Sequence, residues 1–289
     1  MNSITKKKVR VSDAFVYGLI YLCAGISVLL IVGIIIYVFV KGFSQINWEF
    51  LTTTTSILKG TVGIAGNILN TVYIVVLTML LVTPIGVGAA IYLNEYAKPV
   101  RLVRIIELAT ETLSGIPSII FGMFGMMFFG TTLGLKYSIL TGTLTLTLMV
   151  LPLITRNTQE ALKTVPDSYR HGAVALGAGK WYTIRTILLP SAMPGIITGV
   201  ILAVGRIVGE SAALLYTAGS SDLLPATAKA YLGKILQPGG TLTIKLYLSA
   251  QDGEFDVAFG IALVLLVIVL VINMGTKFIA KKFDVNRLN

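Results

Sequence analysis

The chain has 289 residues, of which 55% are hydrophobic and only 12% are charged, and its formal net charge is +10. Its mean hydropathy of +0.86 is far too high for the surface of an ordinary water-soluble protein. The composition therefore excludes a soluble globular domain and indicates an integral membrane protein. The single cysteine, Cys23, allows no intrachain disulfide and indicates no metal or thiol framework, so we expect a small packing residue there.

The first long apolar segment is Ala14–Val40, which runs 27 residues without a charged side chain. A helix needs about 20 such residues to cross the hydrocarbon layer. Four basic residues precede the segment, as in a secretory signal, but its apolar part is far longer than the roughly 7–15 residues of such a signal. Five further segments are each about long enough to span: Asn67–Leu93, Ile105–Phe129, Tyr137–Ile154, Met193–Thr217 and Val257–Ile279. We therefore expect an all-α integral membrane protein with about six transmembrane helices.

The basic residues predict the orientation of these spans. Six spans place both termini on one side, and if that side is the cytoplasm, sixteen Lys and Arg residues lie inside and six outside. This asymmetry fits the positive-inside rule, so it accounts for the net positive charge without nucleic acid, which we do not expect as a partner. The predicted location is the cytoplasmic membrane, with the lipid bilayer as surroundings and both termini cytoplasmic.

No linker, low-complexity stretch or short repeat divides the chain, so one membrane domain is the simplest interpretation. We expect a cytoplasmic tail at 1–13, a single transmembrane domain at 14–280 and a second cytoplasmic tail at 281–289. The longest loops are expected outside at Gly42–Gly66 and Ala218–Asp256, and inside at 156–192.

The inside loop is too polar to span and predicts a pair of short helices. Asp167 can cap the first helix, and Gly177 can end it where a left-handed residue is wanted. A second helix is expected from about Lys180 until Pro190 stops it. Its apolar residues recur at helical spacing: Trp181, Ile184, Ile187 and Leu188. Such a face must be buried, either on this protein's own helix ends or in a groove of a soluble partner.

At these residues the chain resembles the EAA loop of bacterial ABC importer permeases, whose pattern is EAA, three residues, Gly, nine residues and I-x-L-P. The matching positions here are His171, Gly172, Ala173, Gly177, Ile187, Leu189 and Pro190. The spacing agrees throughout. His171 and Gly172 replace the usual Glu and Ala, so the resemblance does not by itself imply an ion pair from that position to an ATPase.

Two further stretches, Ser114–Gly125 and Ala203–Ser220, resemble the phosphate-importer (PstA-type) permeases of this family. The resemblance implies a type I ABC importer permease fold. It also implies a second homologous (PstC-like) permease, a dimer of (PstB-like) ATPase subunits and an external (PstS-like) phosphate-binding protein as partners. In such an assembly the hairpin residues from Asp167 to Pro190, including Trp181, would couple this chain to the ATPase.

Arg206 lies near the middle of the fifth predicted span, where a charged side chain costs about 2.5–3.5 kcal/mol on insertion scales. Glu210 follows four residues later, on the same face of the expected helix, so one possibility is a structural ion pair. The alternative is that Arg206 faces a translocation pathway and offers its planar fork to phosphate oxygens. The resemblance favours the pathway, because PstA-type permeases carry Arg and Glu at these positions.

Small and helix-breaking residues interrupt the third predicted span at Ser114, Gly115, Pro117 and Ser118. Proline frees a backbone carbonyl, which membrane proteins tolerate where protein or water satisfies it. The segment is either a packing kink or a part of the substrate pathway that includes Ser114 and Ser118. Glu111, one turn earlier, is expected to pair with a basic loop residue.

No ATP site is expected in this chain. A phosphate-cradling loop needs G-x-x-x-x-G-K-[ST], and the near match at Gly179-Lys180 has Val174 for the first glycine and Trp181 after the lysine. We therefore expect no enzyme activity and no cofactor in this chain, with ATP and Mg²⁺ used by a partner ATPase. The predicted function is transport of phosphate by alternating access. The alternatives are an ABC permease for another oxyanion, such as molybdate or sulfate, and an ion-coupled secondary transporter.

Overall fold

The computed structural model describes residues 11–56, 60–97, 100–225 and 227–282 and is almost wholly helical. Within these ranges, five helices are long and apolar enough to cross a membrane, and a bent helix pair makes a sixth crossing if it counts as one span. The long helices are α1 (Val11–Phe43), α3 (Ala65–Ile91), α6 (Ile139–Lys163), α9 (Leu189–Val208) and α13 (Phe255–Lys282). The predicted membrane fold is confirmed. The predicted tails at 1–13 and 281–289 fall mostly outside the described residues and stay predictions.

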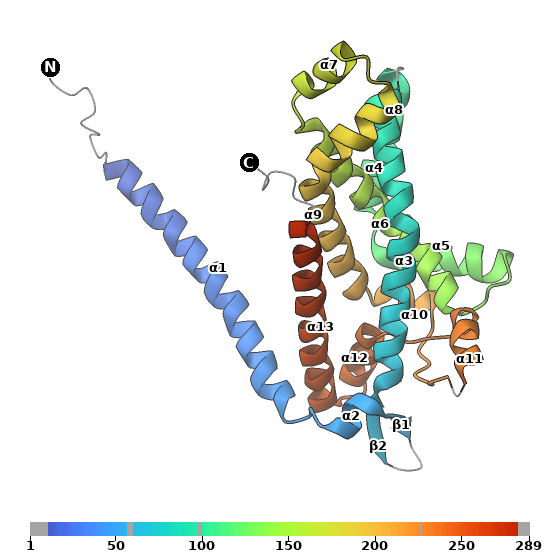
Figure 1. The fold of residues 1–289 in the computed structure, drawn as a ribbon. Helices are drawn as coiled ribbons and strands as arrows, with labels where there is room; N and C mark the ends of the chain where they lie inside the picture. The colour runs from blue at the N-terminus through green and yellow to red at the C-terminus, as the bar shows by residue number, and fades with distance from the viewer. Residues whose placement is uncertain (1–10, 57–59, 98–99, 226, 283–289) are drawn as a thin grey trace.

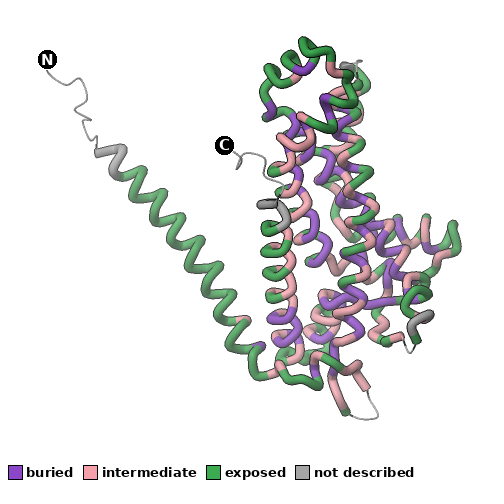
Figure 2. The backbone as a smooth tube through the Cα atoms, viewed as in Figure 1, coloured by how far each residue is buried: buried purple, intermediate pink, exposed green. Residues whose placement is uncertain are grey.

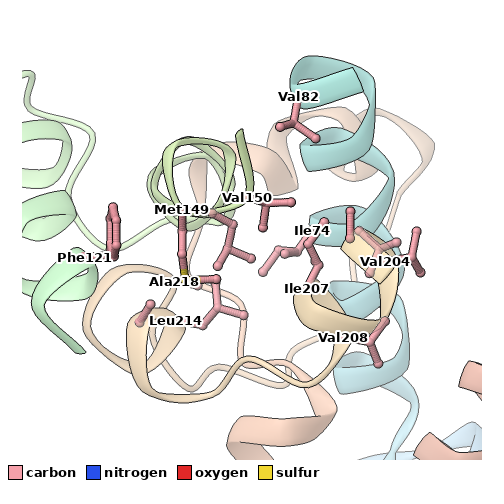
Figure 3. Packing of buried hydrophobic residues seen from close by; sticks show 14 of the residues in the cluster. Ile74, Val82, Phe121, Met149, Val150, Val204, Ile207, Val208, Leu214 and Ala218 are labelled. Atoms are coloured by element: carbon pink, nitrogen blue, oxygen red, sulfur yellow. The ribbon is translucent and has the colours of Figure 1, made fainter. Parts of the chain in front are cut away.

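Helices α3, α6 and α9 form the centre of the bundle, with α6 packed between the other two. Glycines allow close approach, because a Cβ at Gly86 of α3 would lie 2.6 Å from Ile154 of α6, and one at Gly199 of α9 would lie 2.7 Å from Asn157 of α6. Figure 3 shows the buried side chains that fill the space between these helices, including Ile74, Met149 and Ile207. Figure 2 shows the same region as the main concentration of buried residues.

Helix α1 stands away from this bundle and touches it near its own C-terminal end (Figures 1 and 2). There, Tyr37 packs edge-on against Phe259 of α13 with ring centroids 5.4 Å apart. A Cβ at Gly42 would lie 2.4 Å from the Phe259 carbonyl, so glycine permits this approach. Nearly all other apolar side chains described in α1 are exposed, as suits a helix that contacts lipid or another membrane subunit.

The third predicted span, Ile105–Phe129, is not continuous. Helix α4 (Val100–Gly115) ends just before Ile116 and Pro117, and the chain resumes as α5 (Ser118–Gly125) and the π-helical η2 (Met126–Thr132). The two parts meet at 100°. Proline at 117 lacks an amide donor and fixes an extended backbone there (ψ 139°), which breaks the helix.

The fifth predicted span, Met193–Thr217, is also interrupted. Helix α9 ends at Val208, Gly209 is its C-cap, and a separate short helix, α10 (Ala212–Thr217), follows. Glu210 therefore lies in the connection between two helices. The prediction that it shares a helix face with Arg206 is wrong, because Gly209 ends the helix first.

At one end of the bundle lies the hairpin of α7 (Asp167–Ala175), α8 (Lys180–Thr183) and the π-helical η3 (Ile184–Leu188), as Figure 1 shows. Gly177 has φ 77°, so the predicted left-handed residue is confirmed. Asp167 is the first residue of α7 rather than its cap, because Pro166 occupies that position. Pro190 does not stop the second helix. The π-helical turn before it shifts the hydrogen-bond register, and the helix runs on into α9.

The two loops predicted outside lie together at the opposite end (Figure 1). They contain α2 (Trp48–Thr52), the antiparallel strands β1 (Thr54–Ser56) and β2 (Thr61–Ile64), α11 (Ala228–Gly233), the 3₁₀ turn η4 (Lys234–Leu236) and α12 (Leu242–Gln251). The start of α3 holds the second loop, because the Asn67 and Asn70 amides both donate to the Gly240 carbonyl, at 2.9 and 3.1 Å. The hairpin and these loops therefore occupy opposite ends, as predicted.

Candidate translocation and coupling sites

Arg206 is in the last turn of α9 and its side chain is exposed. Its guanidinium forms no hydrogen bond or ion pair with any other residue that the structure describes. The neighbouring Gly205 faces open space, since a Cβ there would meet nothing within 4 Å. A guanidinium on a membrane helix is costly unless water, a ligand or another protein group compensates it, and the described residues supply no such group.

Glu210 is engaged elsewhere. Its Oε1 accepts the backbone N–H of Ala213 at 3.0 Å, which caps the start of α10, and its carbonyl accepts the Thr243 hydroxyl at 3.0 Å. The structural ion pair considered between Arg206 and Glu210 is therefore not formed. Glu210 lies in the connection between α9 and α10. The Thr243 hydroxyl joins this connection to α12.

The two serines of the predicted pathway lie on either side of the α4–α5 break. Ser114 is exposed at the end of α4 and donates to the Thr110 carbonyl at 2.9 Å, while Ser118 begins α5. Helix α5 packs on α10, and a Cβ at Gly122 would lie 2.8 Å from Cα of Ala213. The short helices that follow the two interruptions are therefore packed against each other. Sequence had given no sign of this contact.

A cavity of about 470 Å³ opens between α4, α5, α6 and the end of α3 with η1 (Tyr92–Tyr96). Its lining is almost entirely apolar and includes Ile106, Leu113, Ile116, Phe121, Phe124 and Leu148. A multiply charged anion would lose its hydration there without compensation. The cavity is therefore not an anion site, and Arg206 is not among its lining residues.

The inner face of the hairpin packs on this chain itself. Ile184 and Leu188 are fully buried in a cluster with Leu162 and Val165 at the end of α6, and Ala173 of α7 is also buried. Ile187, Leu189 and Pro190 are partly buried at the start of α9. Part of the predicted apolar face is therefore buried on the chain's own helix ends, which was the first of the two expected alternatives.

The outer face of the hairpin remains apolar and uncovered. Leu176 is 90% exposed and Trp181 is 60% exposed, and Val174 and Tyr182 are exposed beside them. His171 and Gly172, which stand in place of the usual Glu and Ala, are exposed as well. An exposed group of large apolar side chains on an ordered hairpin is typical of a docking surface.

Two charged residues that the sequence did not single out join the hairpin to the bundle. Arg170 of α7 donates from Nη2 to Glu95 Oε1 at 3.0 Å and to the Leu162 carbonyl at 3.1 Å, and from Nη1 to the Val165 carbonyl at 3.0 Å. Glu95 lies in the π-helical segment η1 (Tyr92–Tyr96), which extends α3. The partners are 75 residues apart in sequence, so no local spacing could have revealed them.

A second group of charges lies where α4 meets the end of α6. Arg156 contacts Glu111 at 3.7 Å and Glu160 at 3.2 Å, and Lys163 contacts Glu107 at 3.9 Å. Glu111 pairs with a basic residue, as predicted, but that residue, Arg156, lies in α6 and not in a loop. These side chains are largely exposed, so each ion pair contributes at most about 1 kcal/mol to stability.

Interrupted membrane helices and an exposed apolar hairpin at one end of a multi-pass helical bundle are features found in membrane transport proteins. Residues 82–285 match the family described as binding-protein-dependent transport system inner membrane component. The chain belongs to this family of ABC importer permeases, which work with ATPase and substrate-binding partners.

Relatives agree with this assignment. The chain is 36% identical over 281 residues to the probable ABC transporter permease protein YqgI of Bacillus subtilis, covering 93% of this chain and 95% of that protein. It is 30% identical over 278 residues to the phosphate transport system permease protein PstA 2 of Mycobacterium tuberculosis, covering 96% and 91%. Among solved structures, a permease of a bacterial alginate ABC transporter superposes with a TM-score of 0.69 at 15% identity, covering 95% and 96%. That structure supports the type I importer fold alone.

Proposed function

We propose that this chain is the permease subunit that carries inorganic phosphate through an ATP-driven importer in the cytoplasmic membrane. The observation that supports it most is the exposed Arg206, whose guanidinium is unpaired within the described chain beside the break between α9 and α10. A planar fork of N–H donors matches phosphate oxygens. The 30% identity to a phosphate permease over almost the whole chain supports the same substrate.

The pathway would form between this chain and a second, homologous PstC-like permease. Arg206, with Ser114 and Ser118 at the other interruption, would face the shared surface. A weak site is sufficient, since the anion must leave as readily as it enters. Transport would follow alternating access, with the path open first outward and then inward.

Glu210 is proposed to contribute to discrimination. Monohydrogen phosphate carries a proton that sulfate lacks near neutral pH, so an ionised carboxylate accepts a hydrogen bond from phosphate and repels sulfate. Glu210 Oε1 is held by the Ala213 amide, whereas no described residue donates a hydrogen bond to its Oε2. That second oxygen is available to a ligand.

The energy would come from two PstB-like ATPase subunits that dock on the outer face of the hairpin. Asp167, His171, Gly172 and Trp181 would lie at this contact, while Ala173, Gly177 and the residues Ile187, Leu189 and Pro190 support its shape. ATP and Mg²⁺ would be bound by the ATPase and no cofactor by this chain. The hairpin and both termini would be cytoplasmic, and a PstS-like phosphate-binding protein would deliver substrate to the opposite end.

The direct test uses vesicles that contain the complete transporter. We expect uptake of radiolabelled phosphate that requires ATP inside the vesicle and persists when ion gradients are abolished. Uptake driven by a gradient without ATP would establish a secondary transporter instead. Sulfate and molybdate serve as competing substrates, and preferential uptake of either would assign the permease to that oxyanion.

A further inference from the structure

Arg170 joins the hairpin to two other parts of the bundle. Its guanidinium, on α7, binds the Leu162 carbonyl in α6, the Val165 carbonyl just after α6, and the Glu95 carboxylate in η1. Nη1 also reaches Asp167 Oδ1 at 3.0 Å within α7. Its five N–H donors allow this because they are held in a fixed planar fork.

The burial of this pair separates it from the other ion pairs of the described chain. The side chains of Arg170 and Glu95 are 22% and 10% exposed, whereas Arg156 and Glu111 are each 61% exposed. An exposed pair exchanges partners with water and constrains little. A buried, multiply hydrogen-bonded pair keeps its geometry, because breaking it leaves a charge uncompensated.

The second helix of the hairpin is fastened to the same point. Lys180, at the start of α8, donates its ammonium group to the Glu95 carbonyl and lies over the Tyr96 ring, 4.6 Å from its centroid. Both helices of the hairpin are thus fixed to η1. Glu95 is itself held in place by the Asn94 amide, which donates to Oε1 at 2.8 Å.

Chain connectivity explains why this attachment matters. The hairpin continues directly from α6 and directly into α9, but it has no covalent connection to α3. Its other contact with the end of α3 is apolar packing around Ile91 and the buried residues of α6 and η3. Apolar contacts have no preferred direction and can slide, whereas the guanidinium–carboxylate contact is directional.

We infer that Arg170 and Glu95 are positioning residues for energy coupling, which pass displacement of the hairpin to α3 and so make α3, α6 and α9 move together. This inference rests on the proposed function, because it assigns to the hairpin the docking of an ATPase. Neither residue contacts the substrate. Without the pair, only Lys180 and apolar packing would link the hairpin to α3. Helix α3 would then follow the hairpin less closely, and more ATP would be consumed for each phosphate carried.

The test measures ATP hydrolysis and uptake of radiolabelled inorganic phosphate in the same vesicles, with the complete transporter and an excess of binding protein. The main variant combines Glu95→Met with Arg170→Met, which removes both charges and leaves no buried charge unpaired. We expect the complex to assemble and hydrolyse ATP near the parental rate. The phosphate carried per ATP hydrolysed should fall by about tenfold or more, equivalent to about 1.4 kcal/mol of coupling.

Arg170→Lys keeps both charges but loses the planar guanidinium, so the phosphate carried per ATP hydrolysed should be intermediate. This variant serves as the test if the double variant does not assemble. Glu107→Gln makes the corresponding change in the exposed pair with Lys163 and should leave the ratio unchanged. A parental ratio in the double variant or in Arg170→Lys would overturn the inference. Proportionate loss of hydrolysis and uptake would overturn it too, because that result means structural damage only.

Uptake by vesicles with the parental transporter separates failure of this inference from failure of the substrate assignment. Uptake of sulfate or molybdate in place of phosphate would contradict the substrate assignment alone. The ratio of anion carried to ATP hydrolysed would then be measured with that anion, and the same change in ratio would still be expected in the double variant.

Discussion

Two arginines of this chain occupy opposite environments. Arg170, in the hairpin, is mostly buried and binds a carboxylate and two carbonyls of neighbouring elements. Arg206, at the end of α9, is exposed, and its guanidinium has no ion pair or hydrogen bond with the other described residues. The nearby carboxylate of Glu210 is used to cap α10. A satisfied charge fixes the geometry of its surroundings, whereas an unsatisfied one on a membrane helix is available to a ligand or partner.

The largest effect is expected where the two interrupted spans meet. Gly122→Ala places a Cβ 2.8 Å from Cα of Ala213, so α5 and α10 must move apart, at a cost of about 1–3 kcal/mol of stability. Gly205→Ala beside Arg206 is the matched control, because its Cβ meets open space and should stabilise the helix by about 0.5–1 kcal/mol. Thermal unfolding in detergent measures both. Equal melting temperatures for the two variants would show that the α5–α10 contact is not tight.

The outer face of the hairpin gives the next largest effect. Trp181→Ala should weaken ATPase binding by about 2 kcal/mol, or roughly 30-fold, as is typical of a central aromatic contact. Leu232→Ala, which truncates an even more exposed apolar residue at the opposite end, should leave binding unchanged. Affinity is measured by titrating the ATPase onto permeases in nanodiscs. Unchanged binding with Trp181→Ala would mean that this face does not dock the ATPase.

A third cationic side chain, Lys234, lies at the end of the molecule opposite the hairpin and can be compared with the two arginines. Its side chain is buried and donates to the Leu223 carbonyl at 2.9 Å and the Pro238 carbonyl at 3.2 Å. Burial lowers the pKa of Lys234 from its ordinary value of 10.5, with partial compensation by Asp222. Lys234→Met should cost about 1 kcal/mol at neutral pH, because two carbonyls lose their donor.

The pH dependence follows from the direction of this shift. Between the lowered pKa of the folded state and 10.5, the unfolded chain binds more protons at Lys234 than the folded chain does. Stability of the parent should therefore rise with pH through that alkaline window and stay level below it. Comparison of melting temperatures with those of Lys234→Met isolates the group. A parent that loses stability in the window relative to the variant would contradict the burial argument.

Glu210→Gln should have the smallest effect on stability, below about 0.5 kcal/mol, because the amide oxygen can still accept the Ala213 N–H. Its effect on selectivity should be clearer. Replacing the carboxylate weakens the hydrogen bond from monohydrogen phosphate by about 1 kcal/mol, so the preference for phosphate over sulfate should fall roughly fivefold. Competitive uptake measures this preference. The same preference in variant and parent would remove Glu210 from discrimination.

Much of the fold could be predicted from the sequence, because its signals are local. Apolar length gives the spans, and Gly177 at the end of a short helical pattern predicts the left-handed turn that the structure contains. The hairpin is likewise predicted from a short stretch of sequence. The orientation of the spans follows from counting Lys and Arg in the loops and tails. The break at Pro117 also has a local signal, but the apolar run continues past it and masks the 100° bend.

The sites were less predictable, because they depend on distant contacts. Gly209 ends α9 and turns Glu210 towards Ala213, although four-residue spacing suggested an ion pair with Arg206. The pairing of Arg170 with Glu95 joins residues from separate helices. Spacing within one helix predicts neighbours only while that helix continues.

The most direct test of the account is phosphate uptake by the assembled transporter carrying Arg206→Gln. We expect a loss of about tenfold or more, equivalent to at least about 1.4 kcal/mol, with assembly and binding-protein docking intact. Arg104→Gln, which changes an exposed arginine near the start of α4 and before the predicted span at Ile105, is the control and should retain parental uptake. Unchanged phosphate uptake by an assembled Arg206→Gln transporter would contradict the assignment of this arginine to the pathway.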